Sequence, residues 1–232
     1  MSNEESLGSF KERKYQIMKN KIIDDNGDSM MTVRFSHCLE KDTLTEQVKC
    51  IFAEAGKPEE YDHSLRVADN IVKLSEKYNL DKTQTYTAAM LHDTGKIIEV
   101  KKRIEFCSRN DMEILDEEKD QPELLHQKIS AKLASLLFSI EDEEILNAIS
   151  IHTTLSSDPG LLGKLLFIAD KLILEDEEYR EVVEAMNKEV YDNFSADKAI
   201  SIYLEYLFFT DDDKTLHPWM KNAYKKFNKS LL

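Results

Sequence analysis

The stretch "TYTAAMLHDTGK" (residues 85–96) reads as a helix made for a protein core, yet it ends on an imidazole and a carboxylate. Its first seven residues are uncharged and mostly small or apolar. His92 and Asp93 follow side by side, and Gly95 then breaks the helix. A buried carboxylate without a partner costs several kcal/mol, roughly 2 to 7 or more on apolar transfer scales. We therefore expect other parts of the chain to supply a partner for Asp93.

The residues around this stretch predict an all-α fold. Six glycines, four prolines and almost no alternating β-branched runs among 232 residues favour helices with a 3.6-residue period. We expect an N-terminal extension of unknown role over residues 1–42, within which "MMTVRF" (residues 30–35) fits a short strand. One helical domain follows over residues 43–232, with a charged, irregular loop over residues 97–120.

Charge and hydropathy exclude several classes of partner. The formal net charge of −14 argues against nucleic acid polymers, because binding them needs basic residues that displace phosphate counterions. A small polyphosphate would also be repelled unless its site carried positive charge, which bound divalent cations supply. No segment approaches the roughly 20 apolar residues of a membrane span, and the N-terminus lacks the build of a signal peptide. We expect a cytoplasmic protein without a membrane partner.

The cysteines carry a separate prediction. Cys38, Cys50 and Cys107 are odd in number, widely separated, and form no C-x-x-C pair. This spacing argues against a disulfide framework and against a cysteine-based zinc site, so we expect reduced thiols that are buried or inert.

Six polar side chains fall on, or at the ends of, the apolar stripes of separate predicted helices. They are His63, His92, Asp93, His126, His152 and Asp170. A single histidine on an apolar face is more often a satisfied core residue than a ligand, but six such groups together favour a shared site. Two histidines remain, His37 in the irregular N-terminal region and His217, which we expect to be exposed before Pro218, and we assign neither a role in this site.

Asp170 narrows the kind of site. Its neighbours one turn away are apolar, so its carboxylate must be neutralised, hydrogen-bonded or bound to a metal. Imidazole and carboxylate together suit iron, manganese, zinc or nickel, and six groups exceed the needs of one tetrahedral zinc. We predict a buried centre of two divalent metals bridged by Asp93.

The order H…HD…H…H…D resembles the HD superfamily of metal-dependent phosphohydrolases. The segments "EEYDHSLRVADNIVKLSEKY", "AAMLHDTGK", "ELLHQKISAKL", "ILNAISIHTT" and "LLGKLLFIADKL" are similar, in this order, to its YqeK-type family, over about residues 44–230. The resemblance implies an HD-domain helical bundle, usually dimeric, with a di-metal centre that is often iron, although manganese or another transition metal also suits the ligands. It also implies symmetrical hydrolysis of dinucleoside polyphosphates by a metal-activated hydroxide, which cuts diadenosine tetraphosphate into two ADP.

Carried over residue by residue, the resemblance places His63, His92, Asp93 and Asp170 on one metal, and His126 and His152 near the second metal or the phosphates. The chain departs from the family at "HTTLSSDPG", where Leu155 replaces the glycine of the usual HTTGR and no arginine follows. It departs again at Lys171, where an aromatic residue is usual.

Four further residues are candidates for substrate contacts. Lys96 lies just beyond the helix break and is positioned to balance charge on phosphoryl oxygens, which makes it a catalytic candidate beside Asp93. Arg66, one turn from His63, is a second cation. Thr153 and Thr154 carry hydroxyls that suit phosphate. The plainer alternative is that both cations are solvated and both threonines simply end a helix.

Two other functions fit the same ligands. HD-type centres with mixed-valent iron also carry out oxygenations, so a di-iron oxygenase is one alternative. Another is a nucleotide-binding regulatory protein with little turnover, which the missing arginine of the HTTGR pattern would favour.

Overall fold

The computed structural model describes residues 30–210 and 216–228, and within these ranges every regular element is a helix. The all-α prediction is therefore confirmed. The α-helices are α2 (Met30–Leu39), α3 (Leu44–Glu54), α4 (Pro58–Tyr78), α5 (Lys82–Leu91), α6 (Val100–Arg109), α7 (Asp116–Asp120), α8 (Leu125–Phe138), α9 (Glu143–Ile151), α10 (Gly160–Lys171), α11 (Arg180–Tyr191), α12 (Ala196–Thr210) and α13 (Pro218–Phe227). Short 3-10 turns are η1 (Thr94–Ile97), η2 (Pro122–Leu124) and η3 (Glu177–Tyr179).

The helix boundaries follow local chemistry. Thr43 accepts from the Glu46 backbone N–H, and Glu46 reaches back to Thr43, so a capping box begins α3. Pro58 opens α4, where a missing N–H has no cost. Asp142 accepts from two backbone N–H groups at the start of α9, and its acidic neighbours favour that end of the helix dipole.

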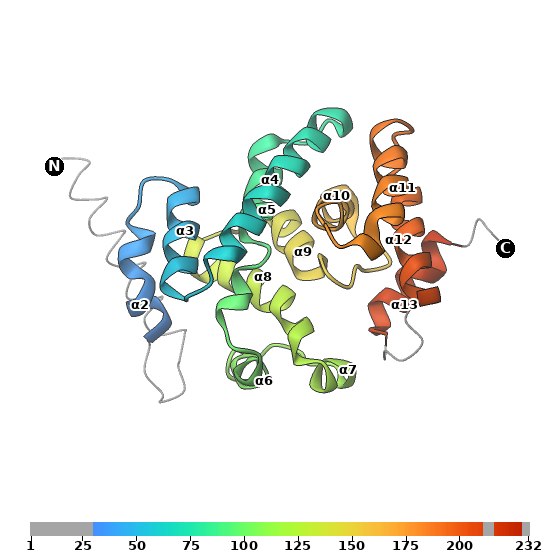
Figure 1. Ribbon diagram of the computed structural model, residues 1–232. Helices are drawn as coiled ribbons and strands as arrows, with labels where there is room; N and C mark the ends of the chain where they lie inside the picture. Colours follow the sequence, from blue (N-terminus) through green and yellow to red (C-terminus); the bar gives the residue numbers. More distant parts are fainter. Residues whose placement is uncertain (1–29, 211–215, 229–232) are drawn as a thin grey trace.

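The arrangement has a centre and two flanks (Figure 1). Helices α4, α5, α8, α9 and α10 lie in the middle, α2 and α3 lie at one end, and α11 to α13 lie at the other. Nine residues of α10, from Leu162 to Lys171, are buried, because it packs against α4, α9 and α12. Such all-round burial is typical of a central helix.

The N-terminal region differs from expectation. Residues 30–35, which fit a short strand, instead begin α2, and His37 lies on this helix. Phe35 and Cys38, three residues apart, bury their side chains with Ile51 of α3, so the helical period decides the local structure.

No helix within residues 30–210 and 216–228 combines the length and the hydropathy needed to cross a membrane.

Residues 97–120 also differ, since they contain α6 and α7 where a loop was expected. The buried face of α6 is made by Arg103, Phe106 and Cys107. Arg103 donates from Nε to the Ile98 carbonyl oxygen at 3.1 Å and from Nη1 to that of Glu123 at 2.7 Å. Because a charged residue occupies a core position, the apolar stripe of this helix is hard to recognise in the sequence.

Two expectations about single residues are wrong. Cys38 and Cys50 form a disulfide between α2 and α3, because the short connection brings their facing sides to a Cα–Cα distance of 5.4 Å, while Cys107 is free and buried. His217 is buried rather than exposed, because Glu118 of α7 covers it, with 3.3 Å between His217 Nε2 and Glu118 Oε1.

Candidate metal centre

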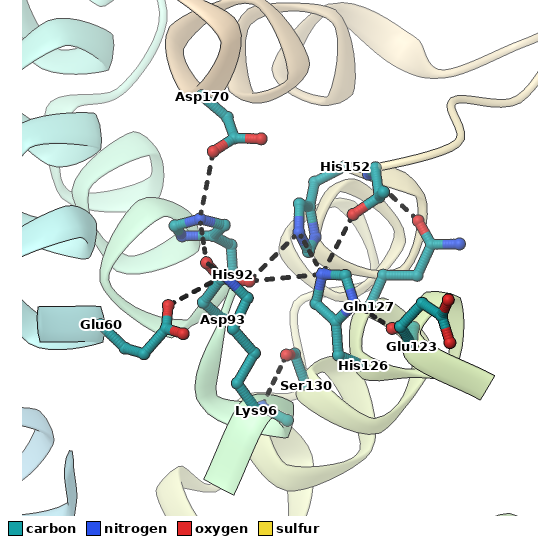
Figure 2. A network of polar contacts seen from close by, with 12 residues as sticks. Glu60, His92, Asp93, Lys96, Glu123, His126, Gln127, Ser130, His152 and Asp170 are labelled. Atoms are coloured by element: carbon teal, nitrogen blue, oxygen red, sulfur yellow. Dashed lines mark hydrogen bonds and ion pairs between the residues drawn. The ribbon is translucent and has the colours of Figure 1, made fainter. Parts of the chain in front are cut away.

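The structure brings the six predicted residues together, and we call them the central cluster. His63 lies within α4, His92 directly follows α5, and Asp93 precedes η1. His126 lies at the start of α8, His152 directly follows α9, and Asp170 lies near the end of α10. Figure 2 labels five of them, His92, Asp93, His126, His152 and Asp170, which point toward one interior point.

One side of the cluster forms around Asp93 Oδ2, and we call it the Oδ2 half. It contains His63, His92 and Asp170. The His63 Nε2 atom lies 3.2 Å from Asp93 Oδ2, 3.0 Å from Asp170 Oδ1 and 3.1 Å from His92 Nε2. His92 Nε2 is itself 3.2 Å from Asp93 Oδ2. Two carboxylates and two imidazoles therefore share one small space.

The other side forms around Asp93 Oδ1, and we call it the Oδ1 half. His126 and His152 place their Nε2 atoms 3.4 and 3.5 Å from Asp93 Oδ1 and 3.2 Å from each other. Asp93 thus directs one carboxylate oxygen into each half. This placement is what a bridging carboxylate requires.

The tautomers of the histidines test whether a cation fits. His126 and His152 each use Nδ1 to donate to a backbone carbonyl oxygen, that of Glu123 at 2.6 Å and that of Ile149 at 2.8 Å. Their Nε2 atoms therefore carry lone pairs that face each other, and Asp93 Oδ1 is buried without a hydrogen-bond partner among the described residues. His92 likewise donates from Nδ1 to the Ala89 carbonyl oxygen, at 2.6 Å. Buried acceptors that face one another fit a bound divalent cation, and such backbone bonds commonly orient metal-binding imidazoles.

The electrostatics of the two halves are opposite. Burial lowers the pKa of His126 to about 3, and it also lowers the pKa of His152, so both are neutral near pH 7. Burial would also lower the pKa of His92, but the Asp93 and Asp170 carboxylates together outweigh it and raise that pKa to about 10. The Oδ2 half therefore holds at least one proton against its carboxylates, whereas the Oδ1 half holds none.

The two carboxylates of the cluster remain ionised. Burial would raise the pKa of each, yet both lie well below the usual range of an aspartate. For Asp93 the largest opposing cause is His92, and for Asp170 it is Lys171, whose ammonium contacts the Asp170 carboxylate. Lys171, which replaces the usual aromatic residue, thus adds a buried positive charge beside the Oδ2 half.

Lys96 reaches the cluster. Its Nζ lies 2.8 Å from Asp93 Oδ2 and 2.8 Å from Glu60 Oε2 (Figure 2). Burial would lower the pKa of Lys96, but these two carboxylates raise it above its usual value. Glu60 was not predicted from the sequence, although it stands three residues before His63 on α4 and so shares its face.

The other candidate substrate residues have different surroundings. Arg66 pairs with Glu175 at the exposed surface rather than reaching the cluster. Thr153 Oγ1 lies 3.1 Å from His126 Nε2. Thr154 is buried and exchanges hydrogen bonds with Gln127, whose Oε1 also accepts from the Thr153 backbone N–H at 3.1 Å. Gln127 was not predicted either, because nothing but its place beside His126 marks it.

Two backbone positions hold the halves in place. A Cβ on Gly95 would lie 2.2 Å from the His126 carbonyl oxygen, so only glycine lets η1 approach α8 this closely. The Gly95 N–H donates to Ser130 Oγ at 2.8 Å. Leu155, which follows the two threonines, has a left-handed φ of 54° and a fully buried side chain. It keeps the backbone form that a glycine would favour.

Comparisons with known proteins identify the family to which the chain is similar. The family model described as "HD domain" matches residues 61–175, which include the whole central cluster. The chain is 31% identical over 157 residues to a symmetrical bis(5'-nucleosyl)-tetraphosphatase of Staphylococcus aureus, covering 67% of this chain and 78% of that protein. It is 29% identical to an uncharacterized protein in the pepC 5'region of Lactococcus lactis subsp. cremoris, covering 83% and 95%.

A solved structure is similar as well. It is the crystal structure of a predicted HD superfamily hydrolase involved in NAD metabolism from Clostridium acetobutylicum. The two superpose with a TM-score of 0.72 at 28% identity, over 80% of this chain and 97% of the other.

Proposed function

The chain belongs to the HD superfamily, with symmetrical bis(5'-nucleosyl)-tetraphosphatases among its relatives, and from this premise we propose that it hydrolyses dinucleoside polyphosphates. The substrate we propose is diadenosine tetraphosphate, cut symmetrically into two ADP. The kind of enzyme, an HD-domain phosphohydrolase, is common to these relatives, whereas the substrate is our inference for this chain.

The observation that carries the proposal is that metal-ligating side chains gather on both sides of Asp93, in the Oδ2 half and in the Oδ1 half. We propose that His63, His92, Asp170 and Asp93 Oδ2 hold one divalent cation, and that His126, His152 and Asp93 Oδ1 hold a second. Neutral imidazoles facing a buried, unpartnered carboxylate oxygen support this assignment. When bound, such a pair of cations supplies a hydrolytic nucleophile at neutral pH and offsets phosphate charge. We propose iron as the resident metal, from the family resemblance and this ligand set.

Protein side chains do the remaining work in this proposal. Lys96 stands beside Asp93 with its ammonium kept charged by two carboxylates, so it can hold a phosphoryl oxygen that approaches the cluster. The Thr153 hydroxyl, 3.1 Å from His126 Nε2, is placed to donate to a second phosphate oxygen. With no HTTGR-type arginine after Thr154, the polyphosphate loses one basic contact. We therefore expect a higher KM than in relatives that have this arginine.

The net charge of −14 supports the same division of labour. An acidic surface repels a polyphosphate, so its capture depends on positive charge concentrated at the site. The cations and Lys96 provide that charge.

We also propose that the protein forms a homodimer, as is usual in the family that the sequence resembles.

The test is a product analysis on purified protein of known metal content. Diadenosine tetraphosphate is offered beside nucleoside di- and triphosphates and guanosine tetraphosphate, and the products are separated by chromatography. We expect ADP alone from diadenosine tetraphosphate, with little hydrolysis of mononucleotides. AMP together with ATP would exclude symmetrical cleavage.

Two further readouts separate the alternatives. Tight nucleotide binding without product, by protein that holds both metals, would instead indicate a regulatory role. Oxygen uptake with an organic substrate would indicate an oxygenase.

A further inference from the structure

A second group of metal-ligating side chains lies away from the central cluster, between α2 and α3, and we call it the cysteine cluster. It contains His37 and Cys38 from the last turn of α2, and Cys50 and Glu54 from α3. In Figure 1 these two helices occupy the end of the molecule opposite α11 to α13. The proposed hydrolysis does not use these residues, and the HD-domain match begins after them, at residue 61.

The distances from His37 to the other three residues of the cysteine cluster resemble those between ligands of a tetrahedral metal site. His37 Nε2 lies 3.5 Å from Cys38 Sγ, 3.7 Å from Cys50 Sγ and 3.2 Å from Glu54 Oε1. Ligands held about 2.0 to 2.3 Å from one zinc ion at tetrahedral angles lie roughly 3.3 to 3.8 Å apart. His37 therefore already stands, relative to both sulfurs and the carboxylate, where a shared zinc would hold it.

The helices explain why four ligands meet here. Cys50 and Glu54 are four residues apart on α3 and so lie one turn apart on the same face. Cys38 is fully buried in the small apolar contact that joins α2 to α3, while His37 lies at its rim and is half exposed. Two sulfurs, one imidazole and one carboxylate make a set that zinc accepts readily.

We propose that reduction of the Cys38–Cys50 disulfide creates a zinc site made by His37, Cys38, Cys50 and Glu54. A dithiol reductant supplies two electrons and two protons, which open the S–S bond to two thiols while the reductant becomes a disulfide. Zinc then binds both sulfurs as thiolates and releases their two protons to solvent. In either state the cluster ties α2 to α3, by a covalent bond when oxidised and by the metal when reduced.

The sequence offers a reason why this site is easily missed. Zinc sites are usually recognised from two closely spaced pairs of ligands, whereas here the two cysteines stand twelve residues apart. Adjacent His37 and Cys38 form one pair, and Cys50 with Glu54 forms the other across a helical turn. The connection between the helices then closes the site.

The experiment uses cobalt(II) as an optical probe in place of zinc. Full-length protein is reduced with a phosphine, freed of metal, and titrated with cobalt, and thiolate-to-cobalt charge-transfer absorption is recorded. The central cluster contains no sulfur, so this band reports on the cysteine cluster alone. We expect the band in reduced protein, its loss on adding zinc in excess over all the proposed metal sites, and no band in oxidised protein.

Variants make the test specific. Cys50→Ser should abolish the band, and His37→Ala, which leaves both cysteines in place, should weaken cobalt binding by at least roughly tenfold. Cys107→Ser, which removes a buried cysteine outside the cluster, is the matched control and should keep the band. Absence of the band in folded, reduced wild-type protein, or its persistence in Cys50→Ser, would leave a structural disulfide only and overturn the proposal. Because none of these readouts involves turnover, they stand apart from any test of hydrolysis.

Discussion

The Oδ2 half and the Oδ1 half of the central cluster share Asp93, yet they balance its charge differently. In the Oδ2 half, a protonated His92 and two lysines, Lys96 and Lys171, face the ionised carboxylates. In the Oδ1 half, two neutral imidazoles face a carboxylate oxygen that has no hydrogen-bond partner among the described residues.

The difference teaches what each half does before metal arrives. In the Oδ2 half, protons and ammonium groups balance the charge of the carboxylates. In the Oδ1 half, no cationic group of the described residues does so. A metal entering the Oδ2 half must therefore compete with protons, whereas a metal entering the Oδ1 half meets imidazole nitrogens that carry no proton.

The largest effect should come from removing the residue that both halves share. We expect Asp93→Ala to lose both cations and to lower turnover by about a thousandfold or more, because several kcal/mol of transition-state stabilisation depend on the metals. Metal analysis and product chromatography measure the two losses. Asp62→Ala, an exposed aspartate on α4, is the matched control and should keep both. Stoichiometric metal and full activity in Asp93→Ala would refute the shared role of Asp93.

The next test separates the halves. Asp170→Asn should weaken the cation of the Oδ2 half by at least about tenfold to a hundredfold and spare the other, while His152→Gln should do the reverse. Calorimetric titration of metal-free protein resolves the two binding events. If both variants lost both cations equally, the two halves would have to be treated as a single site.

Proton release sharpens the comparison further. At pH 8 the metal-free His92, with its pKa near 10, still holds a proton, so filling the Oδ2 half should release it. Affinity in that half should then fall about tenfold per pH unit as the pH drops from 8, whereas His126, with its pKa near 3, gives the Oδ1 half a much flatter dependence down to about pH 6. Titration in buffers of different ionisation enthalpy counts the protons, and equal release from both halves would contradict the assignment.

The same shift predicts the pH dependence of the metal-free fold. A histidine whose pKa is raised in the folded state stabilises that state below its ordinary pKa, near 6.5, and the gain is lost as the pH rises through the folded-state value. Metal-free protein should therefore lose the contribution of His92 between about pH 6.5 and 10. Bound metal replaces the proton and should flatten that loss in thermal melts.

A smaller effect is expected at the edge of the Oδ2 half. Lys96→Ala should keep both cations but raise KM for dinucleoside polyphosphate by about tenfold, since one charge-assisted contact to phosphate is lost. Lys73→Ala, an exposed lysine elsewhere on α4, is the matched control. Unchanged kinetics in Lys96→Ala would leave Lys96 as a structural partner of Asp93 and Glu60.

The sequence predicted the convergence of the central cluster because each member falls on a strong helical pattern. His63 and Asp170, for example, stand on stripes whose apolar neighbours can only face inward. Their role as metal ligands stays a prediction. Gln127 and Glu60 escaped because a polar residue beside a histidine, or one turn from it, has no signature until the backbone is placed.

The predictions that the structure contradicts have local physical causes. Arg103 satisfies its charge on backbone carbonyl oxygens and so occupies a core position that pattern analysis reads as surface. For this reason α6 was not predicted from the sequence. Because α6 and α7 were both expected to be loop, nothing in the sequence indicated that Glu118 of α7 would cover His217. The bond between Cys38 and Cys50 depends on how two helices meet, which cysteine spacing alone does not determine.

Leu155 gives the segment after His152 an unusual thermal behaviour. A left-handed backbone costs a leucine about 1 to 2 kcal/mol, while full burial of its side chain returns roughly 1.5 to 3 kcal/mol. A glycine would hold this shape by itself, but leucine holds it only while the interior stays packed. We therefore expect the Leu155 amide, which donates to the Ile151 carbonyl oxygen at 2.7 Å, to exchange its hydrogen only when the surrounding core opens. Local fraying of this turn and melting of the protein would then be one event.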